Sequence, residues 1–368
     1  METTDTVYLN PPARQHRLTG PGEQVLAYHR SLPGYAPTPL IELPAIASAL
    51  GVRRVLLKDE SSRLGLPAFK ILGASYAIAR ALAARWGLGA AVTVERLRAA
   101  AAEHPPVTLI CATDGNHGRA VARTAAAIGL GCRVFIPGTL TAQAKRAIAA
   151  EGAEVRELDA PYDDVVAAMR EHASEQATDG LVIQDTAWPG YHEIPGWIVD
   201  GYSTMLAELE CQLSETGDAR VDLALAPAGV GSLAQAIVTH FRGVEEPPVV
   251  AVVEPVAAPA ILHALTTGVP RAVPTGRTVM LGLNCGTPSE LAWPVLRDGV
   301  DAAVLVDDDE ALCAVRELRE AGVDSGPCGA ATLAGARRVL DRARGPLGLD
   351  GDSTVVLFNT ESLAANPV

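Results

Sequence analysis

The sequence predicts an α/β protein built on mostly parallel, twisted sheets with helices on both faces. Short runs of valine, isoleucine and leucine alternate with alanine-rich stretches of helical length along the 368 residues. Several runs are apolar throughout, as strands buried on both faces are, and regular alternation of strand and helix is typical of parallel sheets. The expected strands cover 54–58, 107–111, 133–136, 154–157, 181–184, 223–226, 249–253, 303–306 and 354–358.

The alanine-rich stretches between the strands predict the helices. They cover 74–85, 119–128, 142–151, 162–175 and 233–242. Clusters of proline and glycine at 32–39 and 267–276 predict loops. Residues 1–30 are expected to form an arm on the surface.

The composition excludes several classes of protein. No apolar run approaches the roughly 20 residues that cross a bilayer, and a net charge of −13 without a basic stripe argues against nucleic acid and anionic membranes as partners. The six cysteines show no C-x-x-C spacing, which indicates reduced thiols and no metal site. The polar, acidic residues 1–6 are unlike a signal or transit peptide, so a cytoplasmic location is expected.

Lys70 is the most informative residue of the chain. Only three of the 30 basic residues are lysines, and this one lies between the apolar Phe69 and Ile71. An amine in an apolar setting loses proton affinity, and a neutral lysine amine attacks carbonyl groups to form Schiff bases. The alternative interpretation is a lysine whose stem packs on a helix while its head reaches water.

The segment after the strand 107–111 has residue types that suit a ligand site, because ligands of parallel sheets bind at the carboxyl ends of the strands. Asn116 can donate a hydrogen bond to an oxygen of a ligand. Asp114 is a candidate base, although an aspartate in this position also serves as the N-cap of a helix. His117 is interpreted as structural, because the loop that holds it is tight.

The segment 227–233 follows another strand and opens a helix with two glycines and a serine. Such a turn presents backbone N–H groups and the positive end of the helix dipole to an anion. It lacks the ending of a Walker A loop and the glycine spacing of a dinucleotide fingerprint. The segment therefore indicates a phosphate-binding loop without identifying its ligand.

Two further strand ends carry candidate site residues. Asp185 follows the strand 181–184 and precedes two aromatic residues, which suggests recognition of a charged substrate group; the alternative is a turn in which the aspartate bonds to its own backbone. Thr360 follows the last strand, where its hydroxyl could reach a ring nitrogen or only cap the end of the strand.

Together these segments resemble the fold-type II family of pyridoxal phosphate (PLP) enzymes, the group of tryptophan synthase β and the serine/threonine dehydratases. The similarity is greatest to the diaminopropionate ammonia-lyases, for which TDGNHG and the QDTAW…GY block are specific, and it runs from about residue 30 to the C-terminus. The matching stretches are YAPTPL (35–40), LKDESSRLGLPAFKILG (57–73), TDGNHG (113–118), YDD (162–164), QDTAWPGYHEIPGWIVDGY (184–202), AGVGSLA (228–234), VEP (253–255) and LGLNCGTPSELAW (281–293).

The resemblance implies a role for each matching residue. Lys70 holds PLP through a Schiff base, with Phe69 beside the ring. Asn116 bonds the phenolic oxygen of PLP, and Thr360 lies near its pyridine nitrogen. Lys70, Asp114 and Asp185 are the expected catalytic residues, with Asp114 linked to proton abstraction from the D isomer of the substrate. The expected phosphate cradle comprises Gly229, Val230, Gly231, Ser232 and Leu233.

The resemblance also implies a fold, an activity and an assembly. We expect a tryptophan-synthase-β-like pair of open sheets, with a large PLP-binding domain at 1–82 plus 196–368, a small inserted α/β domain at 83–195, and a homodimer. The expected reaction is α,β-elimination of ammonia from 2,3-diaminopropionate or a close analogue, which gives pyruvate and ammonia through an aminoacrylate. The alternatives are a serine or threonine dehydratase, a β-replacement or cyclising enzyme acting on another amino acid, and a PLP-binding protein without catalysis.

Four segments depart from the pattern of that family. SGESGA is replaced by SGPCGA at 325–330, STEGDTD by NTESLA from 359, WEGY by WPGY at 188–191, and GLACGEPN by GLNCGTPS at 282–289. All four are expected at loop ends near the site, where they remove negative charge. The substrate side is therefore predicted to be altered while the residues that hold the cofactor are kept.

Overall fold

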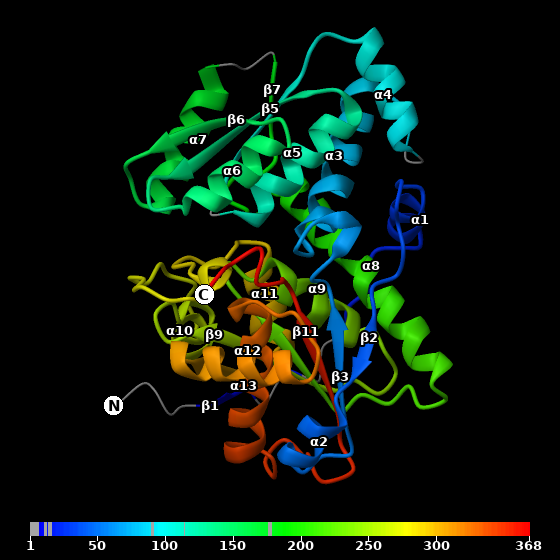
Figure 1. Cartoon of the computed structure of the whole chain (residues 1–368), viewed down its shortest axis with the longest axis vertical. Coiled ribbons are helices and arrows are strands. Elements are labelled where there is room, and N and C mark those ends of the chain that lie inside the picture. Colours follow the sequence, from blue (N-terminus) through cyan, green and yellow to red (C-terminus); the bar gives the residue numbers. More distant parts are fainter. Residues whose placement is uncertain (1–6, 11–12, 14–16, 90–91, 114, 176–178) are drawn as a thin grey trace.

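The computed structural model describes residues 7–10, 13, 17–89, 92–113, 115–175 and 179–368, and these form two sheets. In Figure 1 the four-stranded sheet and its helices form the upper part of the molecule and the seven-stranded sheet the lower part. Helices cover both faces of the larger sheet. The predicted α/β class with mostly parallel sheets is confirmed.

The larger sheet has the strand order β1-β10-β9-β8-β11-β3-β2. Its five central strands are parallel, and β1 and β2 close its two edges in antiparallel register. The strands β8 to β11 are buried along their whole length, which explains their apolar sequences. The strands are β1 (Val7–Leu9), β2 (Leu40–Glu42), β3 (Arg54–Asp59), β8 (Leu223–Pro227), β9 (Val249–Pro255), β10 (Ala302–Val306) and β11 (Thr354–Asn359).

The smaller sheet is entirely parallel and has the strand order β6-β5-β4-β7. Its strands are β4 (Thr108–Ala112), β5 (Gly131–Pro137), β6 (Glu154–Leu158) and β7 (Gly180–Val182). The helices of the chain are α1 (Gln24–Arg30), α2 (Pro44–Leu50), η3 (Arg63–Gly65), α3 (Lys70–Trp86), α4 (Val94–Glu103), α5 (Asn116–Ile128), α6 (Ala142–Ala150), α7 (Tyr162–Glu175), α8 (Glu193–Glu215), α9 (Ser232–Phe241), α10 (Ala260–Thr267), η4 (Leu281–Leu283), α11 (Ala292–Gly299), α12 (Asp308–Glu320) and α13 (Pro327–Arg342).

The described part of residues 1–30 is not the surface arm that the sequence suggested. β1 pairs with β10 at the edge of the larger sheet. In α1, the side chain of His29 is fully buried and its two ring nitrogens lie 2.6 Å from Thr204 Oγ1 and 2.9 Å from Leu72 O. Burial lowers the pKa of His29 to about 3, so the imidazole is neutral. The prediction was wrong because a three-residue strand and a two-turn helix leave little pattern in a sequence.

Helices α3 and α8 cross at a point where both carry glycine. A Cβ atom on Gly73 would lie 2.5 Å from Tyr202 Cε1, and one on Gly201 would lie 2.5 Å from Leu72 O. Real side chains do not tolerate such distances, so glycine at both positions lets the two backbones approach. This close crossing brings Tyr202 under the first turn of α3, where Lys70 is the first helical residue.

A buried network of charges lies between β3, η3 and α8. Glu208 accepts hydrogen bonds from Lys58 at 2.8 Å and from Arg63 at 2.7 Å, and Arg63 also contacts Glu60 at 2.6 Å. The side chains of Lys58 and Arg63 are fully buried. Burial by itself opposes ionisation of Glu208, but the hydrogen bonds and charges of Arg63 and Lys58 outweigh it and lower its pKa to about 2. The network fixes the connection that leads from β3 to Lys70.

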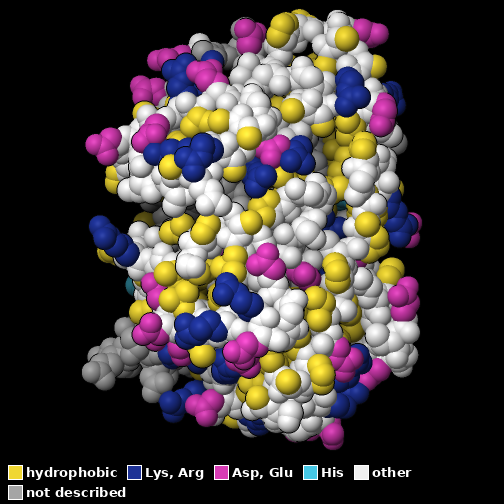
Figure 2. Space-filling model, viewed as in Figure 1, with side chains coloured by type: hydrophobic (Ala, Val, Ile, Leu, Met, Phe, Trp, Pro, Cys, Tyr) yellow, Lys and Arg dark blue, Asp and Glu magenta, His cyan; other side chains and the backbone are white. Residues whose placement is uncertain are grey.

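Two expectations from the composition concern the charges on the surface and helices that could span a membrane. Figure 2 shows basic and acidic side chains interspersed over the face that it presents. Within the described ranges, no helix is long and apolar enough to cross a membrane.

Candidate active site

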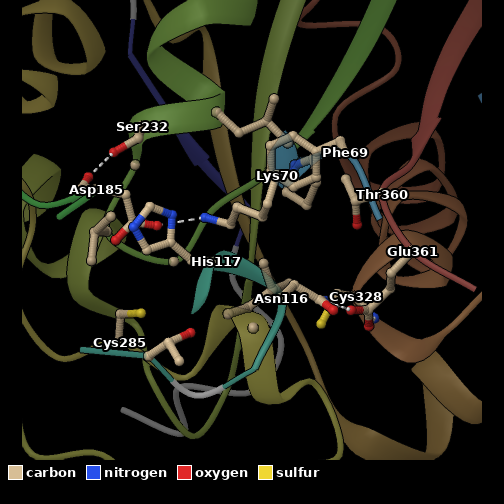
Figure 3. Close-up of a pocket in the computed structure, with 18 of the residues that line it drawn as sticks. Phe69, Lys70, Asn116, His117, Asp185, Ser232, Cys285, Cys328, Thr360 and Glu361 are labelled. Carbon is tan, nitrogen blue, oxygen red and sulfur yellow. Dashed lines mark hydrogen bonds and ion pairs between the residues drawn. The ribbon is translucent and has the colours of Figure 1, made fainter. Parts of the chain in front are cut away.

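The candidate active site is a cavity between the two sheets, at the carboxyl ends of their strands. It is lined by residues that follow β4, β7, β8 and β11 and by the start of α3. Figure 3 shows these side chains converging around Lys70. The structure thus brings together the predicted residues Phe69, Lys70, Asn116, Asp185, Gly229, Val230, Gly231, Ser232, Leu233 and Thr360. Asp114 lies outside the residues that the structure describes.

Lys70 is held at the cavity by its own segment and by an ion pair. The backbone N–H of Phe69 donates to Thr360 O at 3.2 Å, which ties the segment to the end of β11. Lys70 Nζ lies 2.7 Å from Asp185 Oδ2, and the lysine side chain is 21% exposed. The amine therefore does not lie in the wholly apolar setting that its neighbours in the sequence suggested, because a carboxylate from a distant strand end reaches it.

Asp185 is buried beside this amine. Burial by itself opposes ionisation of the carboxyl group, but the positive charge of Lys70 outweighs it and lowers the pKa of Asp185 to about 2. Its backbone oxygen accepts a hydrogen bond of 2.8 Å from Ser232 Oγ, so the strand end after β7 is joined to the turn after β8. Asp185 is thus an ionised carboxylate that can bind a cationic group of a substrate.

The turn after β8 has the geometry of an anion cradle. Gly231 has a φ of 96°, in the left-handed region that favours glycine, and α9 begins at the next residue. A Cβ atom on Gly229 would lie 3.0 Å from both Cys285 Sγ and Gly282 O. The first N–H groups of a helix have no partner within the helix, and the cradle directs those of α9 toward the cavity. The residues present therefore fit a phosphate group.

Gly231→Ala is expected to weaken cofactor binding at least about tenfold, because the new methyl group would force the cradle to shift. Its Cβ would approach Leu296 Cδ1 to 2.8 Å, in a backbone conformation that alanine rarely adopts. Titration of the apoenzyme with PLP, followed by visible absorbance, measures the effect. Gly217→Ala is the control, since Gly217 has a φ of 72° with no atom within 4 Å of a Cβ. Equal affinities for the two variants would contradict the cradle.

Glu361 is a cavity residue that the sequence analysis did not single out. Its carboxyl group is 3% exposed and accepts hydrogen bonds from Asn116 Nδ2 at 2.9 Å and from the backbone N–H of Cys328 at 3.3 Å. Burial raises its pKa. In the sequence, the feature that pointed to Glu361 was its position directly after Thr360, at the end of a predicted strand. After the loss of acidic residues from 325–330 and 359–364, Glu361 thus remains as a buried carboxyl group at the cavity, in addition to Asp185.

His117 behaves largely as the structural residue that was expected. Its ring is buried, and Nε2 lies 2.8 Å from Ile183 O. Burial lowers its pKa, so the ring is neutral and Nε2 carries the proton. Nδ1 has no hydrogen-bond partner among the described residues.

The four departing segments do not all reach the cavity. Cys285 and Cys328 line it, as do residues 282–283 and 360–361. Trp188 instead stacks on Tyr191 with ring centroids 4.2 Å apart, and neither residue lines the cavity. The expectation that all four segments border the site is thus met by three of them. In the described part of the chain, no group of three or more histidine, cysteine or acidic side chains is arranged to hold a metal ion.

Comparison with known proteins defines the class of this site. The family model described as "Pyridoxal-phosphate dependent enzyme" matches residues 31–361. The chain belongs to this family of PLP enzymes, as the sequence motifs indicated, and its cofactor is PLP.

The relatives that the comparison found are more specific. The chain is 38% identical to a diaminopropionate ammonia-lyase of Salmonella typhimurium over 300 residues, which cover 78% of this chain and 72% of that protein. It is 35% identical to the diaminopropionate ammonia-lyase of Escherichia coli K12 over 350 residues, 91% of this chain and 86% of that one. The crystal structure of the Escherichia coli enzyme in complex with D-serine matches with a TM-score of 0.90 and 32% identity, covering 98% and 94% of the two chains.

Proposed function

We propose that this chain is a PLP-dependent lyase that eliminates ammonia from 2,3-diaminopropionate or a close analogue and yields pyruvate and ammonia. The observation that carries the proposal is the ion pair of Lys70 with Asp185 in a cavity that also contains a glycine cradle. The amine of Lys70 suits the attachment of the cofactor, and the carboxylate of Asp185 suits an ammonium group. The cavity therefore suits a substrate that carries two ammonium groups, one for the cofactor and one for Asp185. The relatives named above support the same reaction, and one solved structure of the Escherichia coli enzyme contains an aminoacrylate-PLP azomethine reaction intermediate.

The lining of the cavity supports the cofactor-binding residues that we propose. Lys70 would hold the carbonyl carbon of PLP, and the cradle at 229–233 would bind its phosphate through backbone N–H groups and the hydroxyl of Ser232. Asn116 would bond the phenolic oxygen, Phe69 would pack beside the ring, and Thr360 would serve the pyridine nitrogen. When bound, PLP supplies an electron sink for the negative charge that develops at Cα.

The residues of the chain supply the proton transfers and the recognition of the substrate. Lys70 removes the Cα proton of the L isomer as general base, and Asp114 removes that of the D isomer. Asp185 binds the second ammonium group of the substrate, which serine lacks. The bond from Cβ to nitrogen breaks, and its electron pair leaves with ammonia. The aminoacrylate that remains hydrolyses to pyruvate and a second ammonia.

The direct test is pyruvate release by the PLP-loaded protein supplied with D- or L-2,3-diaminopropionate, with the visible spectrum recorded in the same cuvette. We expect pyruvate from at least one isomer, and slower release from serine, because serine offers Asp185 no ammonium group. A spectral change without pyruvate from any of these amino acids would refute the elimination reaction. It would favour a β-replacement or cyclising enzyme that keeps the same cofactor residues.

The domain limits and the assembly are further proposals. A large domain at 1–82 plus 196–368 is supported by the seven-stranded sheet, which takes strands from both of these segments. A small inserted domain at 83–195 is supported by the four-stranded sheet. By family resemblance we propose a homodimer, and we separately propose a cytoplasmic location.

A further inference from the structure

Tyr202 carries a buried hydroxyl group that the fold does not explain. The residue is fully buried in α8, and its phenolic oxygen has no hydrogen-bond partner among the described residues. A buried polar group without a partner is unfavourable for folding, and most such groups in proteins are paired. Phenylalanine would fill the same space without this cost. The hydroxyl therefore needs a reason other than packing.

The surroundings hold the ring of Tyr202 in one position. It packs on Phe69 with centroids 4.8 Å apart, and Gly73 leaves no room for movement toward α3. The centroid of the Tyr202 ring lies 5.9 Å from Lys70 Nζ, and the centroid of the Phe69 ring lies 5.3 Å from the same atom. The phenol is thus fixed next to the amine, although Tyr202 itself does not line the cavity.

The charges around Tyr202 define its protonation state. Burial raises its pKa to about 12, the positive charge of Lys70 opposes the rise, and the negative charge of Asp185 adds to it. The phenol is therefore neutral at physiological pH, and its oxygen keeps two lone pairs that can accept a hydrogen bond from an amine N–H. His117, a further titratable neighbour of the ion pair, is neutral as well, and its Nε2 is held by Ile183 O.

Lys70 needs such an acceptor if the proposed function is right, and this inference rests on that function. The amine has to turn away from Asp185 when it attacks the carbonyl carbon of PLP. We propose that the Tyr202 hydroxyl is then the positioning group of Lys70: it accepts one N–H of the released amine and so turns the lone pair of Nζ toward the cavity. In the described conformation Asp185 holds the amine, and the hydroxyl lies close to that amine without forming a hydrogen bond of normal geometry.

The test compares Tyr202→Phe with Tyr28→Phe. The apoenzymes are mixed with PLP alone, and the rate at which the visible absorbance of the bound cofactor appears reports capture by Lys70. Tyr202→Phe is expected to slow capture about tenfold, the effect of one hydrogen bond to a charged or reacting group. Its thermal midpoint should equal or exceed that of the parent, because an unpaired buried group is removed.

Tyr28→Phe provides the opposite pattern. Tyr28 is also buried, and its hydroxyl donates to Ser75 O at 3.0 Å. Its loss should lower the thermal midpoint and leave the capture rate unchanged. In turnover, Tyr202→Phe should reduce kcat about tenfold with KM within about twofold, as expected when an interaction is used after binding.

Capture of PLP at the parental rate by Tyr202→Phe, with parental kcat, would overturn the inference. So would a lowered thermal midpoint together with unchanged capture, since that pattern means a structural hydroxyl. The capture experiment contains no amino acid. If the parent protein binds PLP but does not release pyruvate from diaminopropionate, the proposed substrate fails while the role of Tyr202 is still decided by the capture rates.

Discussion

Lys70→Ala is expected to abolish both the visible absorbance of bound PLP and turnover, the latter by at least about three orders of magnitude. Lys70 is the lysine that lines the cavity, and its amine is the group that can form a covalent bond with the carbonyl carbon of the cofactor. Without it, the cradle at 229–233 still offers its N–H groups to the phosphate. The variant should therefore bind PLP reversibly, with the spectrum of the free aldehyde. Absorbance after dialysis and pyruvate release measure the two losses.

The chain offers a matched control in Lys145→Ala. Lys145 lies on helix α6, and its Nζ is 2.8 Å from Glu157 Oε1. It does not line the cavity. Its replacement removes the same charge and should change neither absorbance nor turnover. Borohydride reduction of the loaded parent protein, followed by peptide mapping, should place the cofactor on Lys70. Full activity of Lys70→Ala, or a label on Lys145, would be incompatible with the site described above.

Glu208→Gln is expected to destabilise the folded protein by about 3–5 kcal/mol, the usual effect of removing one member of a buried ion pair. Glu208 lies between Lys58 and Arg63, whose side chains are fully buried, and its loss leaves both charges partly uncompensated. Urea denaturation measures the change. Because the network holds the connection to Lys70, the variant should also bind PLP more weakly.

The pH dependence of stability has a sign that follows from the same carboxylate. Its pKa is lowered to about 2 in the folded state, below its value of roughly 4.3 in an unfolded chain. The contribution of Glu208 is therefore fully present above about pH 5 and is lost as the pH falls toward 2. In Glu208→Gln this part of the acid-induced loss of stability should be absent.

Glu210→Gln is the control for this prediction. Glu210 is exposed on the same helix, so its replacement removes an equal charge from solvent. Surface changes of this kind usually alter the stability by no more than about 0.5 kcal/mol. Equal destabilisation by the two variants would show that the buried network adds nothing specific.

The sequence was informative about the fold where burial leaves a pattern. The predicted strand 223–226 became β8 at Leu223–Pro227 because a run buried on both faces has to be apolar. The edge strands β1 and β2 were not predicted, since three residues leave no periodicity. The predicted strand 181–184 ends early, at Val182, because the N–H of Gln184 donates to the hydroxyl of Tyr191 instead of to a neighbouring strand.

The candidate site was predictable as a set of residues but less so as a geometry. Motifs gave Lys70, Asn116 and the cradle because each follows a strand and carries unusual residue types. The ion pair of Lys70 with Asp185 and the orphaned hydroxyl of Tyr202 depend on contacts between segments more than a hundred residues apart. Lys58 is the one member of the buried network with a visible signal, a rare lysine inside an apolar strand.

The pairing of β11 with β3 has a consequence for the way the protein is made. The register joins Thr354–Asn359 to Arg54–Asp59, and Thr360 O then receives the N–H of Phe69. A ribosome releases residues 54–70 long before residues 354–361 have been synthesised. During that interval the Lys70 segment lacks its neighbouring strand, and the nascent chain cannot hold PLP in a finished site. We therefore expect loading of the cofactor to be a late, post-translational step, and a truncation that removes β11 should yield colourless protein.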